Sequence, residues 1–200
     1  MMKEESPDRG PLVLVARPED VLRAGDEHLL TPHERRRADA LRHRDDRDAH
    51  VAAHLLVRHC AAALTGRPVE ALTLVQRCAE CGSTQHGRPS IEGLPDLHVS
   101  LAHTRGAVAA GADRQPIGVD VERAPAGGLD PAVLSFALTA AETIRVRSAD
   151  DPSAAFLRHW VLKECLVKVG AVTLDVGVAA VASRPPVVGP LGSWTLRRTT

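Results

Sequence analysis

The chain has 200 residues and a mass of 21.3 kDa, which suits one domain or two small lobes sharing a core. Apolar residues make up 44% and charged residues 25%, so the chain can bury a core and is not disordered in bulk. Basic and acidic residues number 25 each, and a chain without basic excess is a poor candidate for general nucleic-acid binding. The absence of a long apolar run argues against a membrane helix, and the charged segment 1–10 is unlike a signal peptide. We therefore expect a cytoplasmic protein, and its four Cys do not make a disulfide framework.

The first half predicts strands alternating with helices. Thr31, Pro32 and Glu34 form a helix start, with Thr as N-cap, Pro at the first position and Glu three residues after the cap. The expected elements are a strand over 11–17, a helix over 31–43, a charged elbow over 44–48, a helix over 49–64, a strand over 72–77, a loop over 78–89, and strands over 97–102 and 107–112.

The second half repeats this plan. The expected elements are a strand over 117–122, a short helix from Asp130, a second capping box over 139–142, a long helix over 153–169, and strands over 174–182 and 192–196. Segment 30–34 resembles 138–142, and 54–60 resembles 159–165 at nearly the same shift along the chain. We predict an α/β (α+β) fold of two similar pseudo-twofold lobes, 1–112 and 113–200. Each lobe would be a small sheet packed by a long helix, with the active site in the cleft between them.

A pair of carboxylates occupies the strand over 117–122. Because alternate residues of a strand share a face, Asp120 and Glu122 would point away from the core, about 7 Å apart. Two carboxylates so placed repel each other unless a cation lies between them, and oxygen ligands of this kind suit Mg²⁺. The alternative is a solvated strand end paired with the adjacent Arg123.

The helix over 153–169 carries two of the three Lys of a chain that otherwise uses Arg. Glu164 and Lys168 share one face, whereas Lys163 shares the next face with Trp160. The helix is apolar nearly all round, which predicts burial, and buried charges need partners. Glu164 could then supply a third carboxylate to a metal site, although a surface Glu–Lys pair one turn apart is the ordinary alternative.

Two segments together resemble a known family. IleGlyValAspValGlu (117–122) and TrpValLeuLysGluCysLeuValLys (160–168) are similar to the signature motifs of 4'-phosphopantetheinyl transferases, and most similar to those of the two-lobed surfactin-type subfamily. Segments 31–35, 86–90 and 100–104 are similar to further family motifs, in the right order. The resemblance covers residues 30 to 175 and agrees with the internal repeat.

The resemblance implies a reaction in which the phosphopantetheine arm of coenzyme A moves to a Ser of a carrier protein, releasing 3',5'-ADP. It implies that Asp120, Glu122 and Glu164 hold Mg²⁺ on the pyrophosphate, with Asp120 also counted among the catalytic residues. It further implies that Glu164 helps to deprotonate the Ser, directly or through water, and that Lys168 neutralises or protonates the pyrophosphate as it breaks. Such chemistry needs mainly positioning and charge neutralisation.

The resemblance also implies a coenzyme site. Arg88 would grip the nucleotide phosphates, His103 would contact a phosphate, and Arg37 and Arg47 are weaker candidates for the 3'-phosphate. We expect Lys163 to serve packing, coenzyme phosphate contact or carrier docking.

The chain departs from the family pattern at three of these positions. Ala102 stands where the family often has Ser, Glu34 stands where a Lys would help to bind the 3'-phosphate, and Asp48 stands where relatives can have His. These departures concern the predicted 3'-phosphate pocket and one phosphate hydrogen bond.

The implied partners are coenzyme A and acyl or peptidyl carrier domains of fatty-acid, polyketide or nonribosomal peptide synthesis, with neither nucleic acid nor membrane, and the protein is expected to be a monomer. Two alternatives remain open. One is a non-catalytic binding module on a decayed transferase frame, although all three carboxylates are present. The other is a different Mg²⁺-dependent phosphotransferase, although the chain lacks a Walker-type Gly-rich loop.

Two other groups of metal-ligating residue types occur in the first half. Cys78 and Cys81 have zinc-knuckle spacing, and His86 lies five residues further on. A tetrahedral site needs four ligands and a second close pair is absent, so we favour a loop with two free thiols. His50 and His54 lie one helical turn apart, and we expect ordinary helix surface or cofactor contact there.

Overall fold

The computed structural model describes residues 10–78, 80–84, 86–124 and 128–170, and the backbone of 187–188 and 194–197. The strands are β1 (Leu12–Ala16), β2 (Leu74–Arg77), β3 (Arg88–Ile91), β4 (His98–Thr104), β5 (Ala107–Asp113), β6 (Ile117–Asp120), β7 (Val187–Val188) and β8 (Trp194–Arg197). The α-helices are α1 (Pro18–Leu22), α2 (Pro32–Asp39), α3 (Arg44–Thr65), α4 (Pro131–Ala137), α5 (Ala140–Arg147) and α6 (Pro152–Val169), and 3-10 turns cover Asp26–Leu29 and Val69–Ala71.

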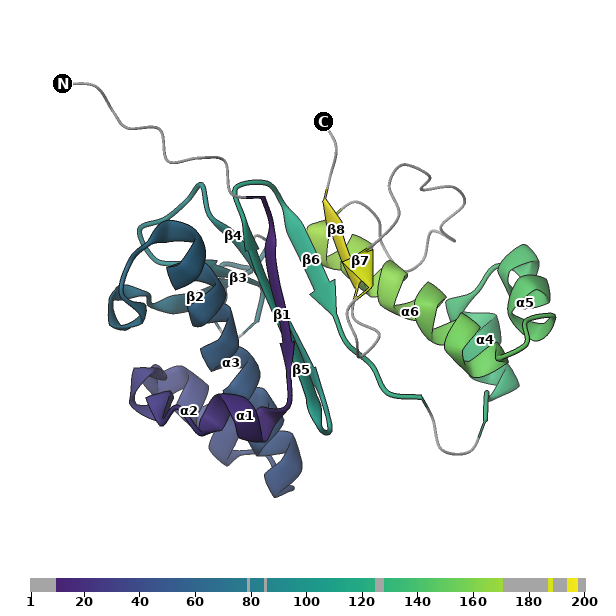
Figure 1. The fold of residues 1–200 in the computed structure, drawn as a ribbon, viewed down its shortest axis with the longest axis horizontal. Helices are drawn as coiled ribbons and strands as arrows, with labels where there is room; N and C mark the ends of the chain where they lie inside the picture. Colours follow the sequence, from purple (N-terminus) through teal and green to yellow (C-terminus); the bar gives the residue numbers. More distant parts are fainter. Residues whose placement is uncertain are drawn as a thin grey trace.

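A five-stranded antiparallel sheet organises the N-terminal part, with strand order β1-β5-β4-β3-β2. The long helix α3 lies across one face of this sheet (Figure 1). Its inward side chains, among them Val51, Leu55 and Val57, are fully buried, and this burial is the main stabilising contribution to the first core.

The other face of this sheet packs against β6. Ala109 of β5 and Val119 of β6 are fully buried in this second apolar cluster. The backbone N–H of Val119 donates to the buried Ser100 Oγ at 2.9 Å, which ties β6 to β4. Gly118 lies where α6 crosses β6, and a Cβ there would overlap the carbonyl group of Cys165. The missing side chain therefore lets the helix approach the strand closely.

A second sheet has the order β6-β8-β7, and α6 runs along it (Figure 1). The helices α4 and α5 pack near the first turns of α6 around Leu134, Val146 and Phe156. None of the helices in the described ranges is long and apolar enough to cross a bilayer.

The predicted α+β class is confirmed, because helices pack on antiparallel sheets. Both predicted capping boxes form, at Thr31 with Glu34 and at Thr139 with Glu142. The boundary between 112 and 113 and the pseudo-twofold relation of two lobes stay predictions, as do the cytoplasmic location and the monomeric state.

Three expectations need correction. The charged segment 44–48 is the first turn of α3 rather than an elbow, because Asp45 and Asp46 suit the N-terminal end of a helix. Segment 88–91 is a strand, since β2 offers it a partner that the loop-like sequence does not reveal. β6 ends at Asp120, so Glu122 follows the strand. The strand expected over 174–182 lies outside the described residues.

Candidate active site

The centre of the site is an ion pair between β6 and α6. Lys168 Nζ donates to Asp120 Oδ1 at 2.8 Å and to the carbonyl oxygen of Val119 at 2.9 Å. The Asp120 side chain is 8% exposed and that of Lys168 is 29% exposed, so this pair is largely shielded from water. The sequence placed Glu164 and Lys168 on one helical face, and the structure directs that face toward the end of β6.

Only one oxygen of the Asp120 carboxylate takes part in the contact with Lys168. Its Oδ2 is buried without a hydrogen-bond partner, although an unpartnered buried oxygen is costly. The pKa of Glu122 is raised by burial and by the negative charge of Asp120, and the pKa of Glu164 is raised by the same two causes. Three mutually repelling carboxylates, one with an unpartnered oxygen, form a donor set that fits a hard divalent cation.

The carboxylate oxygens are not gathered as closely as the sequence implied. Within the described ranges, the three ligand atoms that all lie within 4.8 Å of one another belong to Cys78, Cys81 and His86 and not to the carboxylates. Glu122 follows the end of β6, so strand alternation does not fix its side chain beside that of Asp120. The Lys168 ammonium is the positive charge that contacts Asp120 in this arrangement.

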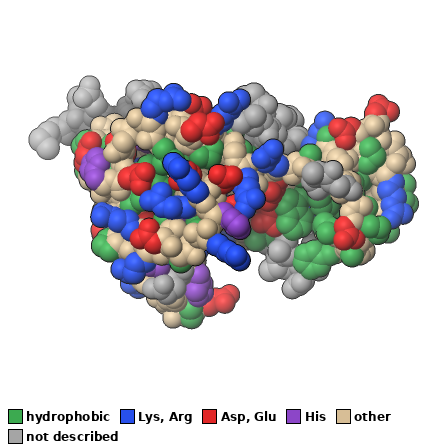
Figure 2. Space-filling view, turned by 90° about the horizontal axis from the view of Figure 1, so that it is seen from below, with side chains coloured by type: hydrophobic (Ala, Val, Ile, Leu, Met, Phe, Trp, Pro, Cys, Tyr) green, Lys and Arg blue, Asp and Glu red, His purple; other side chains and the backbone are tan. Residues whose placement is uncertain are grey.

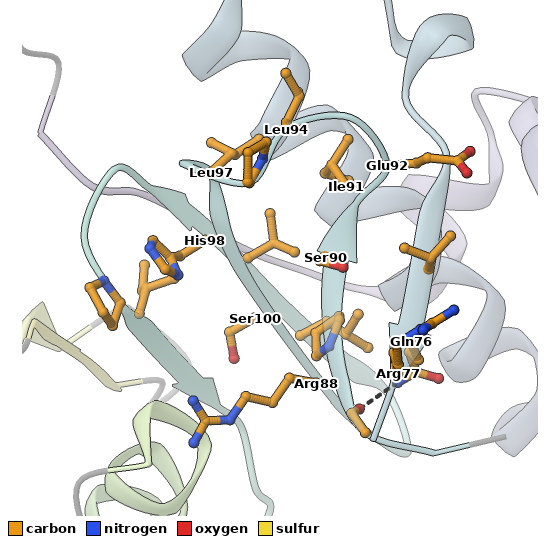
Figure 3. Close-up of a pocket in the computed structure, with 18 of the residues that line it drawn as sticks. Gln76, Arg77, Arg88, Ser90, Ile91, Glu92, Leu94, Leu97, His98 and Ser100 are labelled. Atoms are coloured by element: carbon orange, nitrogen blue, oxygen red, sulfur yellow. Dashed lines mark hydrogen bonds between the residues drawn. The ribbon is translucent and has the colours of Figure 1, made fainter. Parts of the chain in front are cut away.

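A cavity of about 710 Å³ opens beside this ion pair. Residues of β2, β3 and β4 line it, together with Lys168 and Val169 from the end of α6. Figure 3 shows the Arg88 side chain reaching from β3 toward the helix. A Cβ on Gly170 would overlap the Arg88 guanidinium, so the guanidinium lies directly on the helix end. The structure thus brings Arg88 and Lys168, two predicted site residues, to the same cavity.

His103 lies in a cluster of three imidazoles rather than on that cavity's wall. The His50 ring is 4.2 Å from that of His54 and 5.5 Å from that of His103, between centroids. Loss of hydration, together with the neighbouring imidazoles, lowers the pKa of His50 to about 3. Loss of hydration also lowers the pKa of His103, and the charges of His54 and Lys168 act in the same direction. His50 and His54 are buried, so the expectation of an ordinary helix surface was wrong.

The two weaker Arg candidates differ in their surroundings. Arg37 donates to Gln76 Oε1 at 3.3 Å. It is close enough to the imidazole cluster for its positive charge to lower the pKa of His103. Arg47 lies 3.3 Å from a Glu27 oxygen and 3.4 Å from an Asp48 oxygen. These carboxylates offset its charge, which disfavours Arg47 as a phosphate ligand. Figure 2 shows Lys, Arg and His side chains over the N-terminal part, interspersed with Asp and Glu.

Comparisons with known proteins identify one family to which this chain is similar. Residues 116–184, which include β6 and α6, match the 4'-phosphopantetheinyl transferase superfamily. A 4'-phosphopantetheinyl transferase of Bacillus subtilis is 25% identical over 151 residues, covering 74% of this chain and 64% of the relative. The predicted family resemblance is confirmed.

Two further relatives agree with this resemblance to the 4'-phosphopantetheinyl transferases. The 4'-phosphopantetheinyl transferase Sfp of Bacillus subtilis (strain 168) is 25% identical over 140 residues, which are 70% of this chain and 59% of that protein. The 4'-phosphopantetheinyl transferase psf-1 of Bacillus pumilus is 22% identical over 134 residues, which are 67% of this chain and 54% of that protein. The chain therefore spans less than two thirds of the length of these curated relatives.

Lys163, in the segment 160–168 that resembles a 4'-phosphopantetheinyl transferase signature, does not reach the site. Its ammonium is buried and donates to Glu142 Oε2 at 2.8 Å and to the carbonyl oxygen of Ala137. Of the three roles expected for Lys163, which were packing, coenzyme phosphate contact and carrier docking, this buried position fits packing. Five residues along a helix turn the side chain by about 140°, which separates Lys163 from Lys168.

Sequence reasoning missed the anchoring role of the capping-box carboxylates. Glu142 binds Lys163, and Glu34 likewise binds Arg58 at 2.7 Å and His54 at 2.8 Å while capping α2. Glu34 is buried, and these partners together hold its pKa well below the ordinary value despite the opposing effect of burial. Glu34 therefore has a structural role, because it holds α2 against α3 at the position where the family resemblance would place a phosphate-binding Lys. The internal repeat could have indicated this role, because it matches Arg58 with Lys163 and Glu34 with Glu142.

Proposed function

We propose that this protein transfers the 4'-phosphopantetheine arm of coenzyme A to a Ser of an acyl or peptidyl carrier protein and releases 3',5'-ADP. The observation that carries the proposal is the Lys168–Asp120 pair at 2.8 Å, beside a cavity that Arg88 also lines. This arrangement offers two cations to phosphate oxygens and an acidic group beside them, as phosphoryl transfer requires.

The acidic residues fit a divalent metal. The buried Asp120 Oδ2 has no hydrogen-bond partner, and its neighbours Glu122 and Glu164 have raised pKa values. We propose that Asp120, Glu122 and Glu164 hold Mg²⁺. When bound, Mg²⁺ supplies positive charge that neutralises the pyrophosphate of coenzyme A.

Residues of this chain would accept the proton of the attacking Ser and stabilise the leaving group. The carrier Ser Oγ forms a bond to the phosphorus that bears the pantetheine arm, and the bond from that phosphorus to the bridging oxygen breaks. Glu164 takes the Ser proton, directly or through water, since burial and the Asp120 charge raise its pKa. Lys168 stabilises the charge that develops on the departing 3',5'-ADP phosphate.

Coenzyme A would span the cavity and the part of the surface that carries His103 and Arg37. Arg88, held against the end of α6, is placed to bind a phosphate with its planar guanidinium. His103 would donate to a second phosphate oxygen, and the positive charges around it favour an anion there. Arg37 is the better of the two candidates for the 3'-phosphate, because Arg47 is surrounded by carboxylates.

Mass spectrometry of apo carrier proteins tests the proposal. A panel drawn from fatty-acid, polyketide and nonribosomal peptide synthases is incubated with the protein, coenzyme A and Mg²⁺. We expect a mass gain of one phosphopantetheine arm on at least one carrier, and the panel identifies the pathway. A carrier whose reactive Ser is replaced by Ala serves as the control. If every carrier of the panel kept its apo mass, the proposed activity would be wrong.

A further inference from the structure

The loop between β2 and β3 gathers three metal-ligating side chains outside the site described above. One ligand atom from each of Cys78, Cys81 and His86 lies within 4.8 Å of the other two. Cys81 Sγ and His86 Nε2 are 3.3 Å apart. The sequence analysis favoured free thiols here, but the fold places both thiols and the imidazole around one point.

Backbone hydrogen bonds hold the first part of this loop in a tight turn. The N–H of Gly82 donates to the carbonyl oxygen of Cys78 at 3.0 Å, and the N–H of Cys78 donates to the carbonyl oxygen of Ser83 at 2.8 Å. Gly82 takes a φ of 68°, which a glycine adopts without strain. These contacts fold Cys81 back toward Cys78 instead of leaving the loop extended.

The imidazole is held from the other strand. Gly87, next to His86, has a φ of 117°, and a Cβ there would overlap the backbone of Arg77 and Cys78. Arg77 and Arg88 are paired in the β2–β3 ladder. Gly87 therefore lies tightly against the backbone of Arg77 and Cys78, and a residue with a side chain there would displace that backbone and the adjacent His86.

The donor atoms of this group are two thiols and one imidazole. The thiolate is the form of Cys that binds metals, and thiolate with imidazole selects zinc over the hard cations that carboxylates prefer. The donor set therefore differs in kind from that of Asp120, Glu122 and Glu164.

We propose that Cys78, Cys81 and His86 bind one Zn²⁺, with water at the fourth tetrahedral position. The ion would tie the end of β2 to the residue two positions before Arg88, and would thereby hold the strand from which Arg88 reaches the cavity. The proposal stands on the loop geometry and does not depend on the transferase activity.

Metal analysis of the full-length protein tests this. The protein is purified with a non-thiol reductant, loaded with ZnCl₂, freed of excess metal and analysed for zinc. We expect one zinc per chain, and a several-fold lower content in Cys81→Ser and in His86→Ala. His28→Ala, at an exposed His outside the loop, should keep the zinc of the parent. Circular dichroism verifies that the variants are folded.

Cobalt provides an independent measurement. Titration of the zinc-free protein with CoCl₂ should give thiolate-to-metal absorption and the strong visible bands of a tetrahedral site, both lost in Cys81→Ser. Equal zinc content in parent and Cys81→Ser would overturn the proposal. So would an intact mass lower by two hydrogens under reductant with no metal bound, since Cys78 and Cys81 would then form a disulfide. Because the readout is metal content, failure here leaves the proposed transferase untouched.

Discussion

Lys168 Nζ lies 2.8 Å from Asp120 Oδ1, joining residues that are 48 positions apart in the chain. The same ammonium caps the carbonyl oxygen of Val119, so the last turn of α6 is fastened to the end of β6. Each signature segment contributes one partner of this contact, which explains why the two segments are informative together.

The first prediction concerns the Lys168 side chain. In the variant Lys168→Arg, the new side chain keeps the positive charge of Lys, but it is longer, planar and a poor proton donor. We expect loss of most of the turnover, with coenzyme A binding largely kept. Turnover on one carrier protein and calorimetric affinity for coenzyme A measure the two effects separately. Normal turnover in this variant would show that Lys168 does not act on the pyrophosphate.

The second prediction concerns the metal. Asp120→Asn preserves the side chain's size but removes the charge beside the unpartnered Oδ2. We expect Mn²⁺, used as a paramagnetic probe for Mg²⁺, to bind the parent and to bind Asp120→Asn and Glu164→Gln at least tenfold more weakly. Transfer should also stop in EDTA. Unchanged Mn²⁺ affinity in both variants would refute the carboxylate site, and Glu92→Gln, an exposed carboxylate on the cavity's far wall, is the control.

The third prediction concerns coenzyme A. Removing a charge-assisted phosphate contact in Arg88→Ala or His103→Ala should cost about 1.5–3 kcal/mol, roughly ten- to hundredfold in Kd. Arg47→Ala should change the affinity less, because Glu27 and Asp48 already offset that charge. Isothermal titration of the three variants gives the comparison. Equal losses in all three would mean that a diffuse basic field, and not these contacts, binds the phosphates.

The fourth prediction concerns the buried pair of Lys163 and Glu142, whose side chains are 8% and 7% exposed. Lys163→Met leaves a buried carboxylate without its cation, and we expect a loss of about 3 kcal/mol in the free energy of unfolding. Glu142→Gln combined with Lys163→Met should recover part of the loss, since no charge is then stranded. Denaturant unfolding measures both, and strictly additive losses would contradict the pairing.

The fifth prediction concerns pH. The folded protein holds the pKa of His50 at about 3 against an ordinary value of 6.5, so the unfolded chain takes up the proton first as the pH falls. The stability that neutral His50 contributes is complete above pH 6.5 and is lost from there toward pH 3, at up to about 1.4 kcal/mol per pH unit.

The variant His50→Gln removes this titration. Its free energy of unfolding should therefore fall less steeply than that of the parent between pH 6.5 and 4.5, above the range in which Glu34 becomes protonated. Groups facing His50 are His54, His103, Arg37 and Glu34, and all of them remain in the variant. Parallel curves for the two proteins would show that His50 is not buried neutral.

Local sequence patterns were enough to predict the secondary structure and the chemistry of the signature segments. The capping boxes at Thr31 and Thr139, the long α6 and the facing of Glu164 with Lys168 all follow from neighbours within a few residues. Helical periodicity also separated Lys163 from Lys168, although it did not say what Lys163 binds. Such features are encoded locally, and no distant partner is needed to form them.

The partners of the charged groups, in contrast, depend on how the elements pack together. The Lys168–Asp120, Lys163–Glu142 and Arg58–Glu34 pairs each join separate elements. The gathering of Cys78, Cys81 and His86 depends likewise on the pairing of β2 with β3 and on the turn at Gly87. Side-chain spacing along the chain fixes a residue's face but not what the fold packs against that face. Because a buried charge or ligand takes its role from the group opposite it, those roles emerged only with the packing.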